Sequence, residues 1–150
     1  MKTFVGLIFA VALVEFASAV SKEYHDKAIA AKNTCAKLHN VDDETIMKFW
    51  KAHQLPEKEP ETCIIICYLK EMKLVVDGKV DADAWKASNK EKWDDEKHVA
   101  AADEIVDKCS AEVPPTENEC EWGLALTKCA LKHGKEAGIP PPDMEHPKRR

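Results

Sequence analysis

The sequence has little glycine, few aromatic residues and almost no strand pattern. Glycine accounts for 5 of 150 residues and aromatic residues for 7%, and the glycines fall mostly where helical patterns should stop. Three β-branched residues follow one another at 64–66, but this run lies inside a longer helical pattern. Elsewhere hydrophobic residues recur at steps of three and four, as on one face of a helix. These absences argue against a sheet and predict an all-α fold.

An excess of positive charge is also missing. The chain has 22 Lys and Arg against 27 Asp and Glu, a net charge of −5. Nucleic-acid binding needs a basic patch, so we expect no nucleic-acid partner. After the first nineteen residues no segment is long and apolar enough to cross a bilayer, so we expect no membrane insertion.

The sequence contains none of the common catalytic motifs. No Gly-rich phosphate loop, G-x-S-x-G or H-E-x-x-H is present. His25 and Asp26 are adjacent on a predicted helix, so their side chains diverge, and the acidic pairs at 42–43 and 94–95 are typical of helix starts. We therefore predict no enzyme activity, no catalytic residues, no metal site and no cofactor.

The first nineteen residues are predicted to be a signal peptide. Lys2 precedes an apolar run over 4–14, and Ala17-Ser18-Ala19 fits an A-x-A cleavage site. The apolar run is too short for a membrane anchor. We expect a secreted, extracellular protein of one domain, made where disulfides form and persist.

The remaining chain is predicted to be a compact bundle of about six helices over residues 20–136. These are a helix over 22–38 with Ser21 as N-cap, one from Asp43 to before Pro56, one over 60–75, a short one after Asp81 that carries Trp85, one from Asp94 or Asp95 to Pro114, and one from a Thr116–Glu119 capping box to about Gly134. An Asp77-Gly78 turn follows the third helix. Residues 137–150 form a Pro-rich, charged C-terminal tail that we expect to be extended or disordered unless it docks.

Six cysteines are the most specific feature of the sequence. They are Cys35, Cys63, Cys67, Cys109, Cys120 and Cys129, with intervals of 27, 3, 41, 10 and 8 residues. An even number of cysteines behind an export signal predicts three disulfides. Cys63 and Cys67 lie one turn apart on one helix face and cannot easily bond to each other. This leaves twelve of the fifteen pairings, and one helix must be tied to two other elements.

These intervals, on a helical chain behind a signal peptide, resemble those of the insect odorant-binding proteins. The similarity is greatest to the six-cysteine subfamily that includes the pheromone-binding proteins, which fixes the gaps of 3 and 8 residues. It covers essentially the whole chain after the signal peptide. In that family the first cysteine pairs with the third, the second with the fifth and the fourth with the sixth. The resemblance therefore implies Cys35–Cys67, Cys63–Cys120 and Cys109–Cys129.

The resemblance also implies a function. Three disulfides could serve durability in extracellular fluid, or they could hold open an apolar ligand cavity that packing would otherwise close. The family favours the second explanation and predicts a carrier of odorants, pheromones or similar hydrophobic molecules through aqueous fluid, such as sensillar lymph. Its partners would be a small hydrophobic ligand and, downstream, a membrane odorant receptor, and the protein would be a monomer or weak homodimer. The alternative is a binding or effector protein of saliva, venom or reproductive fluid that acts through its surface.

Candidate pocket residues follow from the apolar helix faces. They are Ile65, Leu69, Met72, Trp85, Ala102, Ile105, Leu124, Thr127 and Leu131. Thr127 could instead bond the carbonyl one turn back in its own helix. His98, on the inward face of the fifth helix, is the candidate for a pH switch. The tail differs from the apolar tails suited to plugging a cavity, so we do not expect it to enter the pocket.

Overall fold

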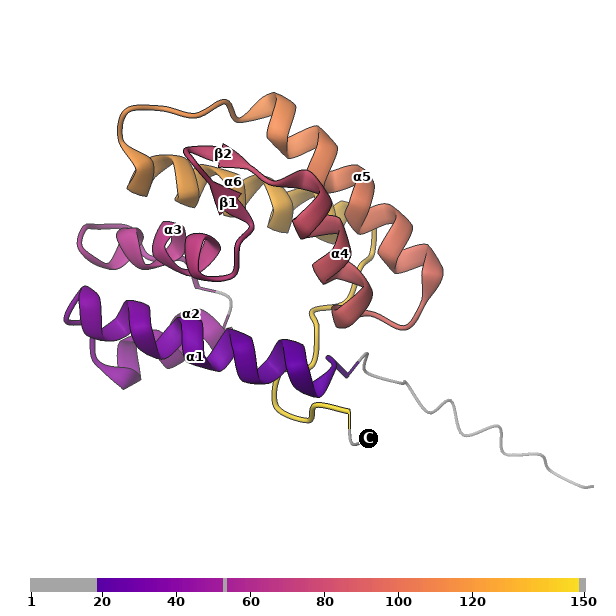
Figure 1. Cartoon of the computed structure of the whole chain (residues 1–150), viewed down its shortest axis with the longest axis horizontal. Helices are drawn as coiled ribbons and strands as arrows, with labels where there is room; N and C mark the ends of the chain where they lie inside the picture. Colours follow the sequence, from indigo (N-terminus) through magenta and orange to yellow (C-terminus); the bar gives the residue numbers. More distant parts are fainter. Residues whose placement is uncertain (1–18, 53, 149–150) are drawn as a thin grey trace, which may run out of the picture.

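The computed structural model describes residues 19–52 and 54–148, without the side chains of 50–52. The predicted signal peptide, apart from Ala19, lies outside this part of the chain. The elements are α1 (Lys22–Leu38), α2 (Asp43–Ala52), α3 (Glu61–Glu71), β1 (Val75–Val76), β2 (Lys79–Val80), α4 (Ala82–Lys92), α5 (Glu96–Glu112) and α6 (Glu119–Glu136), as Figure 1 shows. The fold is an all-α bundle of six helices among the described residues, as predicted. None of these helices combines the length and apolarity needed to cross a membrane.

Three helix starts have the caps that the sequence predicts. The Ser21 side chain accepts a hydrogen bond from the backbone N–H of Tyr24. Asp81 accepts from Ala84 at the start of α4, and Asp95 caps α5 in the same way. Each cap satisfies a backbone donor that has no partner within its helix.

Two predicted helix boundaries, the start of α6 and the end of α3, are wrong. Asn118, not Thr116, caps α6, because its Oδ1 accepts the backbone N–H groups of Cys120 and Glu121 while Thr116 donates to the Asn118 carbonyl. The third helix ends at Glu71 rather than near residue 75. Lys73 adopts a φ of 61°, and this left-handed residue turns the chain out of α3.

The turn at Asp77 and Gly78 belongs to a two-stranded hairpin that the sequence did not predict. β1 and β2 are antiparallel with Val75 opposite Val80. Both turn residues have positive φ, 51° at Asp77 and 71° at Gly78, which suits a tight hairpin between two-residue strands. The hairpin connects α3 to α4.

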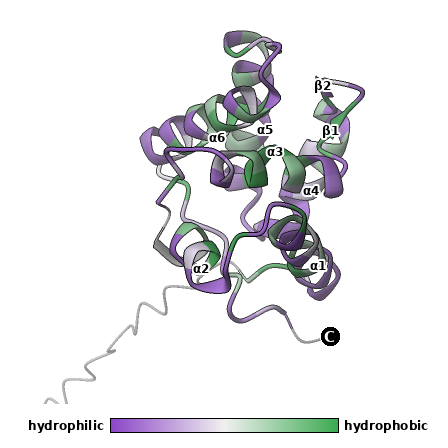
Figure 2. Ribbon diagram, turned by 90° about the vertical axis from the view of Figure 1, so that its left-hand side faces the viewer, coloured by the Kyte–Doolittle hydropathy of each residue, from purple (hydrophilic) through white to green (hydrophobic). Residues whose placement is uncertain are grey.

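α3 lies at the centre of the bundle and is its most hydrophobic helix (Figure 2). It packs against α1 and α6. The approach to α6 is close at Gly123, where an added Cβ would lie 2.8 Å from the Cβ of Ile66. The main buried cluster consists of Val20, Tyr24, Ala28, Ala31, Ile66, Leu69, Met72, Leu74, Val75, Trp122 and Leu126.

Three disulfides tie four of the helices together. Cys35–Cys67 joins α1 to α3, Cys63–Cys120 joins α3 to α6, and Cys109–Cys129 joins α5 to α6. These are the pairs that the family resemblance implies. α3 is tied to two other helices, as the spacing of its cysteines requires.

The C-terminal tail docks on the bundle. Gly138 has a φ of 68°, and the N–H groups of Gly138 and Ile139 bond the carbonyls of Lys135 and Gly134, which turns the chain back beyond α6. The tail then runs past α4 to the start of α1 (Figure 1). The Asp143 carbonyl accepts the N–H of Val20 at 3.3 Å, and an ion pair joins Lys148 to Asp94 on the loop before α5.

Candidate functional site

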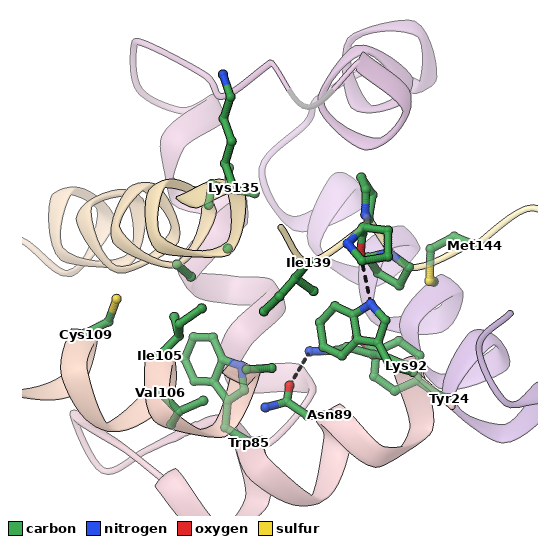
Figure 3. Close-up of a pocket in the computed structure, with 18 of the residues that line it drawn as sticks. Tyr24, Trp85, Asn89, Lys92, Ile105, Val106, Cys109, Lys135, Ile139 and Met144 are labelled. Atoms are coloured by element: carbon green, nitrogen blue, oxygen red, sulfur yellow. Dashed lines mark hydrogen bonds between the residues drawn. The ribbon is translucent and has the colours of Figure 1, made fainter. Parts of the chain in front are cut away.

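A cavity with a volume of about 1000 Å³ lies between the helices and the tail (Figure 3). Its size is at the upper end of small-molecule sites. The lining comes from six helices, the residue after α4 and the tail: Tyr24, Phe49, Tyr68, Trp85, Asn89, Lys92, Trp93, Ala102, Ile105, Val106, Cys109, Ser110, Leu126, Ala130, Leu131, Gly134, Lys135 and residues 139–145.

Four of the nine predicted pocket residues line this cavity. Trp85 belongs to α4, Ala102 and Ile105 to α5, and Leu131 to α6. Figure 3 shows the Trp85 and Ile105 side chains among those that line the cavity. Ligand contact by these four remains a prediction.

The three candidates on α3 and its C-cap lie outside the cavity. Leu69 and Met72 are buried in the main core cluster, and Ile65 packs against it. Because α3 is central, its apolar residues are used to pack against α1 and α6. The only α3 residue on the cavity lining is Tyr68.

The two remaining candidates, Leu124 and Thr127, are not among the residues that line the cavity. The lining of α6 begins at Leu126 and continues with Ala130, Leu131, Gly134 and Lys135. Leu124 lies on the same face as Leu131, seven residues on, but about two turns nearer the helix start, so its position along the helix keeps it off the lining. The Thr127 hydroxyl donates to the Gly123 carbonyl at 3.0 Å, which is the alternative that the sequence left open.

The sequence analysis missed the polar residues of α4. Asn89 and Lys92 follow Trp85 by four and seven residues, so they lie on the same helix face. The signal was therefore present in the spacing. It was overlooked because amide and charged side chains on a helix are ordinarily exposed to solvent.

The Lys92 side chain brings a positively charged amine to the cavity lining. Its Nζ lies 3.4 Å from the Asn89 Oδ1 and 5.5 and 5.7 Å from the ring centres of Tyr24 and Trp93. Burial lowers the pKa of Lys92 to about 8, because the charged form loses hydration. The ring faces and the amide oxygen compensate only part of that loss.

Two tyrosines lie on the side of α1 and α3. Burial raises the pKa of Tyr24 well above its ordinary value, and the neighbouring Tyr68 adds to the shift through repulsion and through a hydrogen bond from Tyr24. Burial also raises the pKa of Tyr68. Both phenols therefore stay protonated and present hydroxyl groups at the lining.

The tail forms part of the cavity wall along residues 139–145, a position that the sequence did not reveal. Ile139, the three prolines and Met144 make this part of the tail apolar, although its end is charged. Trp93 Nε1 donates to the Pro140 carbonyl at 2.9 Å and fixes the first part of the tail. Burial acts to raise the pKa of Asp143, but backbone N–H bonds from His146 and Glu145 outweigh it, and the pKa is lowered.

His98, the candidate pH switch, is not part of the cavity lining. Its Nδ1 is buried and has no hydrogen bond, and it lies 3.9 Å from the Asp95 Oδ2. No site suited to a metal stands out in the described part of the chain. The two clusters of His, Cys or Glu found there each contain both cysteines of a disulfide, which leaves one free ligand per cluster.

A comparison with models of protein families identifies the family to which this chain belongs. The model of the PBP/GOBP family matches residues 17–133. The chain belongs to this family. Residues 134–150, which include the last turn of α6 and the tail on one side of the cavity, lie outside the match.

Two solved structures share the PBP/GOBP fold with this chain. The odorant-binding protein dmelOBP28a from Drosophila melanogaster is 23% identical, with a TM-score of 0.69 over 79% of this chain and 98% of that one. The pheromone-binding protein 3 of Epiphyas postvittana is 22% identical, with a TM-score of 0.61 over 72% of this chain and 96% of that one. No curated protein sequence matches the chain significantly. The family and both structures bear the names of binding proteins, not of enzymes.

Proposed function

We propose that this protein is a secreted carrier that encloses small hydrophobic molecules in the cavity and transports them through aqueous extracellular fluid. The observation that carries the proposal is the cavity itself, about 1000 Å³ and lined mainly by apolar side chains of α4, α5, α6 and the tail. Apolar surface gains about 25 cal/mol per Å² when it leaves water. A ligand of matching size would therefore be retained without any covalent bond.

The covalent framework supports the same proposal. A void of this size in a helical bundle is unfavourable, because its lining lacks packing partners. Disulfides restrict the unfolded chain and offset such a cost. All six cysteines are paired, which fits an oxidising extracellular compartment. The ligand class agrees with the names of the structural relatives, an odorant-binding and a pheromone-binding protein.

Binding of a fluorescent apolar dye tests the proposal directly. We expect the purified protein, without residues 1–19, to bind N-phenylnaphthylamine saturably at about micromolar concentration. Ala102→Phe should fill part of the cavity and weaken binding at least about tenfold, because Ala102 lies on the lining.

Ala111→Phe is the matched control, because Ala111 is exposed on the same helix α5. It should leave dye affinity unchanged within about twofold. If the folded protein binds no dye, or if both variants weaken binding equally, the carrier proposal fails. The surface-acting effector then becomes the better explanation.

A pH response through His98 is proposed as a separate property. The buried Nδ1 has no hydrogen bond, so protonation there would create a donor directed toward Asp95, 3.9 Å away. Because His98 is outside the lining, we expect dye affinity to change only a few-fold between pH 7 and 5, and His98→Gln should remove that change. A flat profile in the wild-type protein would contradict the proposal.

A further inference from the structure

Lys92 is a half-buried cation without an anionic partner among the described residues. Its Nζ forms no ion pair with any described carboxylate, and its contacts are one amide oxygen and two aromatic rings. Buried charges in proteins are normally paired or neutralised. An unpaired ammonium on a cavity wall therefore indicates that its partner arrives with the ligand.

The amine is held in place by a short chain of hydrogen bonds. Asn89 is 1% exposed, its Nδ2 donates to the Asp103 Oδ1 at 2.9 Å, and its Oδ1 faces the Lys92 Nζ at 3.4 Å. The first bond fixes the amide orientation, so the acceptor is directed at the amine. Figure 3 shows Lys92 reaching toward Asn89 within the cavity, while Lys135 extends away from the other labelled residues.

We propose that Lys92 binds the carboxylate of an acidic ligand, such as a fatty acid, whose apolar chain fills the remainder of the cavity. This inference rests on the proposed carrier function and specifies its ligand class. The carboxylate would lie at the α4 end, beside Asn89 and Trp93. The chain would extend toward Ile105 and Leu131, where the lining is apolar.

The protein's own carboxylates at the cavity do not supply this partner. Asp143 is held by the backbone N–H groups of Glu145 and His146, and its Oδ2 faces the His146 ring. Glu145 is exposed to solvent. With a pKa of about 8, Lys92 is mostly charged at pH 7 and offers a full positive charge to an incoming anion.

The test compares ligands that share one chain and differ only at the head. Dodecanoic acid, methyl dodecanoate and dodecanol are titrated into the protein at pH 7, in competition with N-phenylnaphthylamine. We expect the acid to bind at least about tenfold more tightly than the ester, because a charge-assisted hydrogen bond in a cavity is worth more than a neutral one. Lys92→Met, which keeps the side-chain length, should remove that preference and leave ester and alcohol affinity within about threefold.

Lys90→Met is the matched control, because it removes the same charge from an exposed lysine of the same helix α4 that lies outside the cavity lining. It should keep the preference for the acid, and Lys92→Arg should retain part of it. Equal affinity for acid and ester in the wild-type protein, or an unchanged preference in Lys92→Met, would overturn the inference while leaving the carrier function intact. Failure of all three ligands and the dye to bind would overturn both.

Discussion

The two sides of the cavity are built in different ways. On one side, α1, α3, α5 and α6 are linked by three disulfides into a single covalent framework. On the other side, α4 and the tail carry no cysteine. They are held by non-covalent contacts: α4 packs on α5 and forms the Lys86–Asp107 ion pair at 2.7 Å, and Trp93 Nε1 donates to the Pro140 carbonyl at 2.9 Å.

The two sides also differ in the side chains that they contribute to the cavity lining. The framework contributes mainly apolar residues to the lining, from Ala102 to Leu131. The side without disulfides contributes Asn89, Lys92 and Asp143, whereas the polar groups of the framework are mainly the hydroxyls of Tyr24, Tyr68 and Ser110. The framework therefore sets mainly the size of the cavity, and this unlinked side supplies the Lys92 cation. A mutation should change stability or selectivity according to the side on which it falls.

Removal of a disulfide from the framework should have the largest effect. In the chain-entropy model, Cys63→Ala/Cys120→Ala, which opens a separation of 57 residues, should lower the free energy of unfolding by about 4 kcal/mol. Cys109→Ala/Cys129→Ala opens only 20 residues and should cost about 3 kcal/mol. Urea denaturation at pH 7 measures both, and the reverse order would show that native packing rather than loop length decides the effect.

A smaller effect is expected from a change in packing within the framework. Gly123→Ala places a Cβ 2.8 Å from the Ile66 Cβ, so α3 and α6 must separate, and we expect a loss of about 1–2 kcal/mol. Gly134→Ala is the matched control on α6. Its Cβ meets nothing within 4 Å, so it should gain about 0.5–1 kcal/mol through helix propensity. Thermal unfolding of both variants should show shifts of opposite sign, and shifts of the same sign would contradict this account.

The framework was largely predictable from the sequence. Its helices have apolar stripes at regular steps, and its cysteine intervals are those of a known family. The caps at Ser21 and Asp81 were found because they are local signals within four residues. Thr116 and Asn118 are both possible N-cap residues for α6, and the sequence analysis selected the wrong one.

The unlinked side was much less predictable. The position of the tail depends on Gly138 turning the chain and on the distant Trp93 and Val20 offering hydrogen bonds, which no local pattern reveals. The apolar pattern of α6 does not reveal how far along the helix the cavity extends. Leu124 was therefore chosen, although the lining of α6 begins at Leu126. Lys92 was missed because a charged residue on a helix face is ordinarily exposed to solvent.

Lys92 gives a prediction on stability that is independent of any ligand. Its pKa falls from 10.5 to about 8 on folding, so the folded protein binds this proton less tightly than the unfolded chain. Burial of the charge therefore destabilises the protein below about pH 8, and the penalty disappears as the pH rises toward 10.5. Since Lys92 is partly exposed, we expect Lys92→Met to gain about 1–2 kcal/mol at pH 7 and almost nothing at pH 10. Chemical denaturation at both pH values measures this, and an equal gain at pH 7 and pH 10 would contradict it.

Deletion of the tail tests whether the unlinked side matters for binding more than for stability. Removal of residues 140–150 takes away the acceptor of Trp93 and most of the tail lining, so dye affinity should fall about fivefold, or about 1 kcal/mol. Removal of residues 146–150 keeps the lining and loses only the charged end, including the ion pair of Lys148 with Asp94. Exposed ion pairs contribute little, so affinity should then change less than about twofold. If both deletions weaken binding equally, the charged end of the tail, through Lys148, holds the tail on the bundle. The residues that line the cavity would then contribute little to its position.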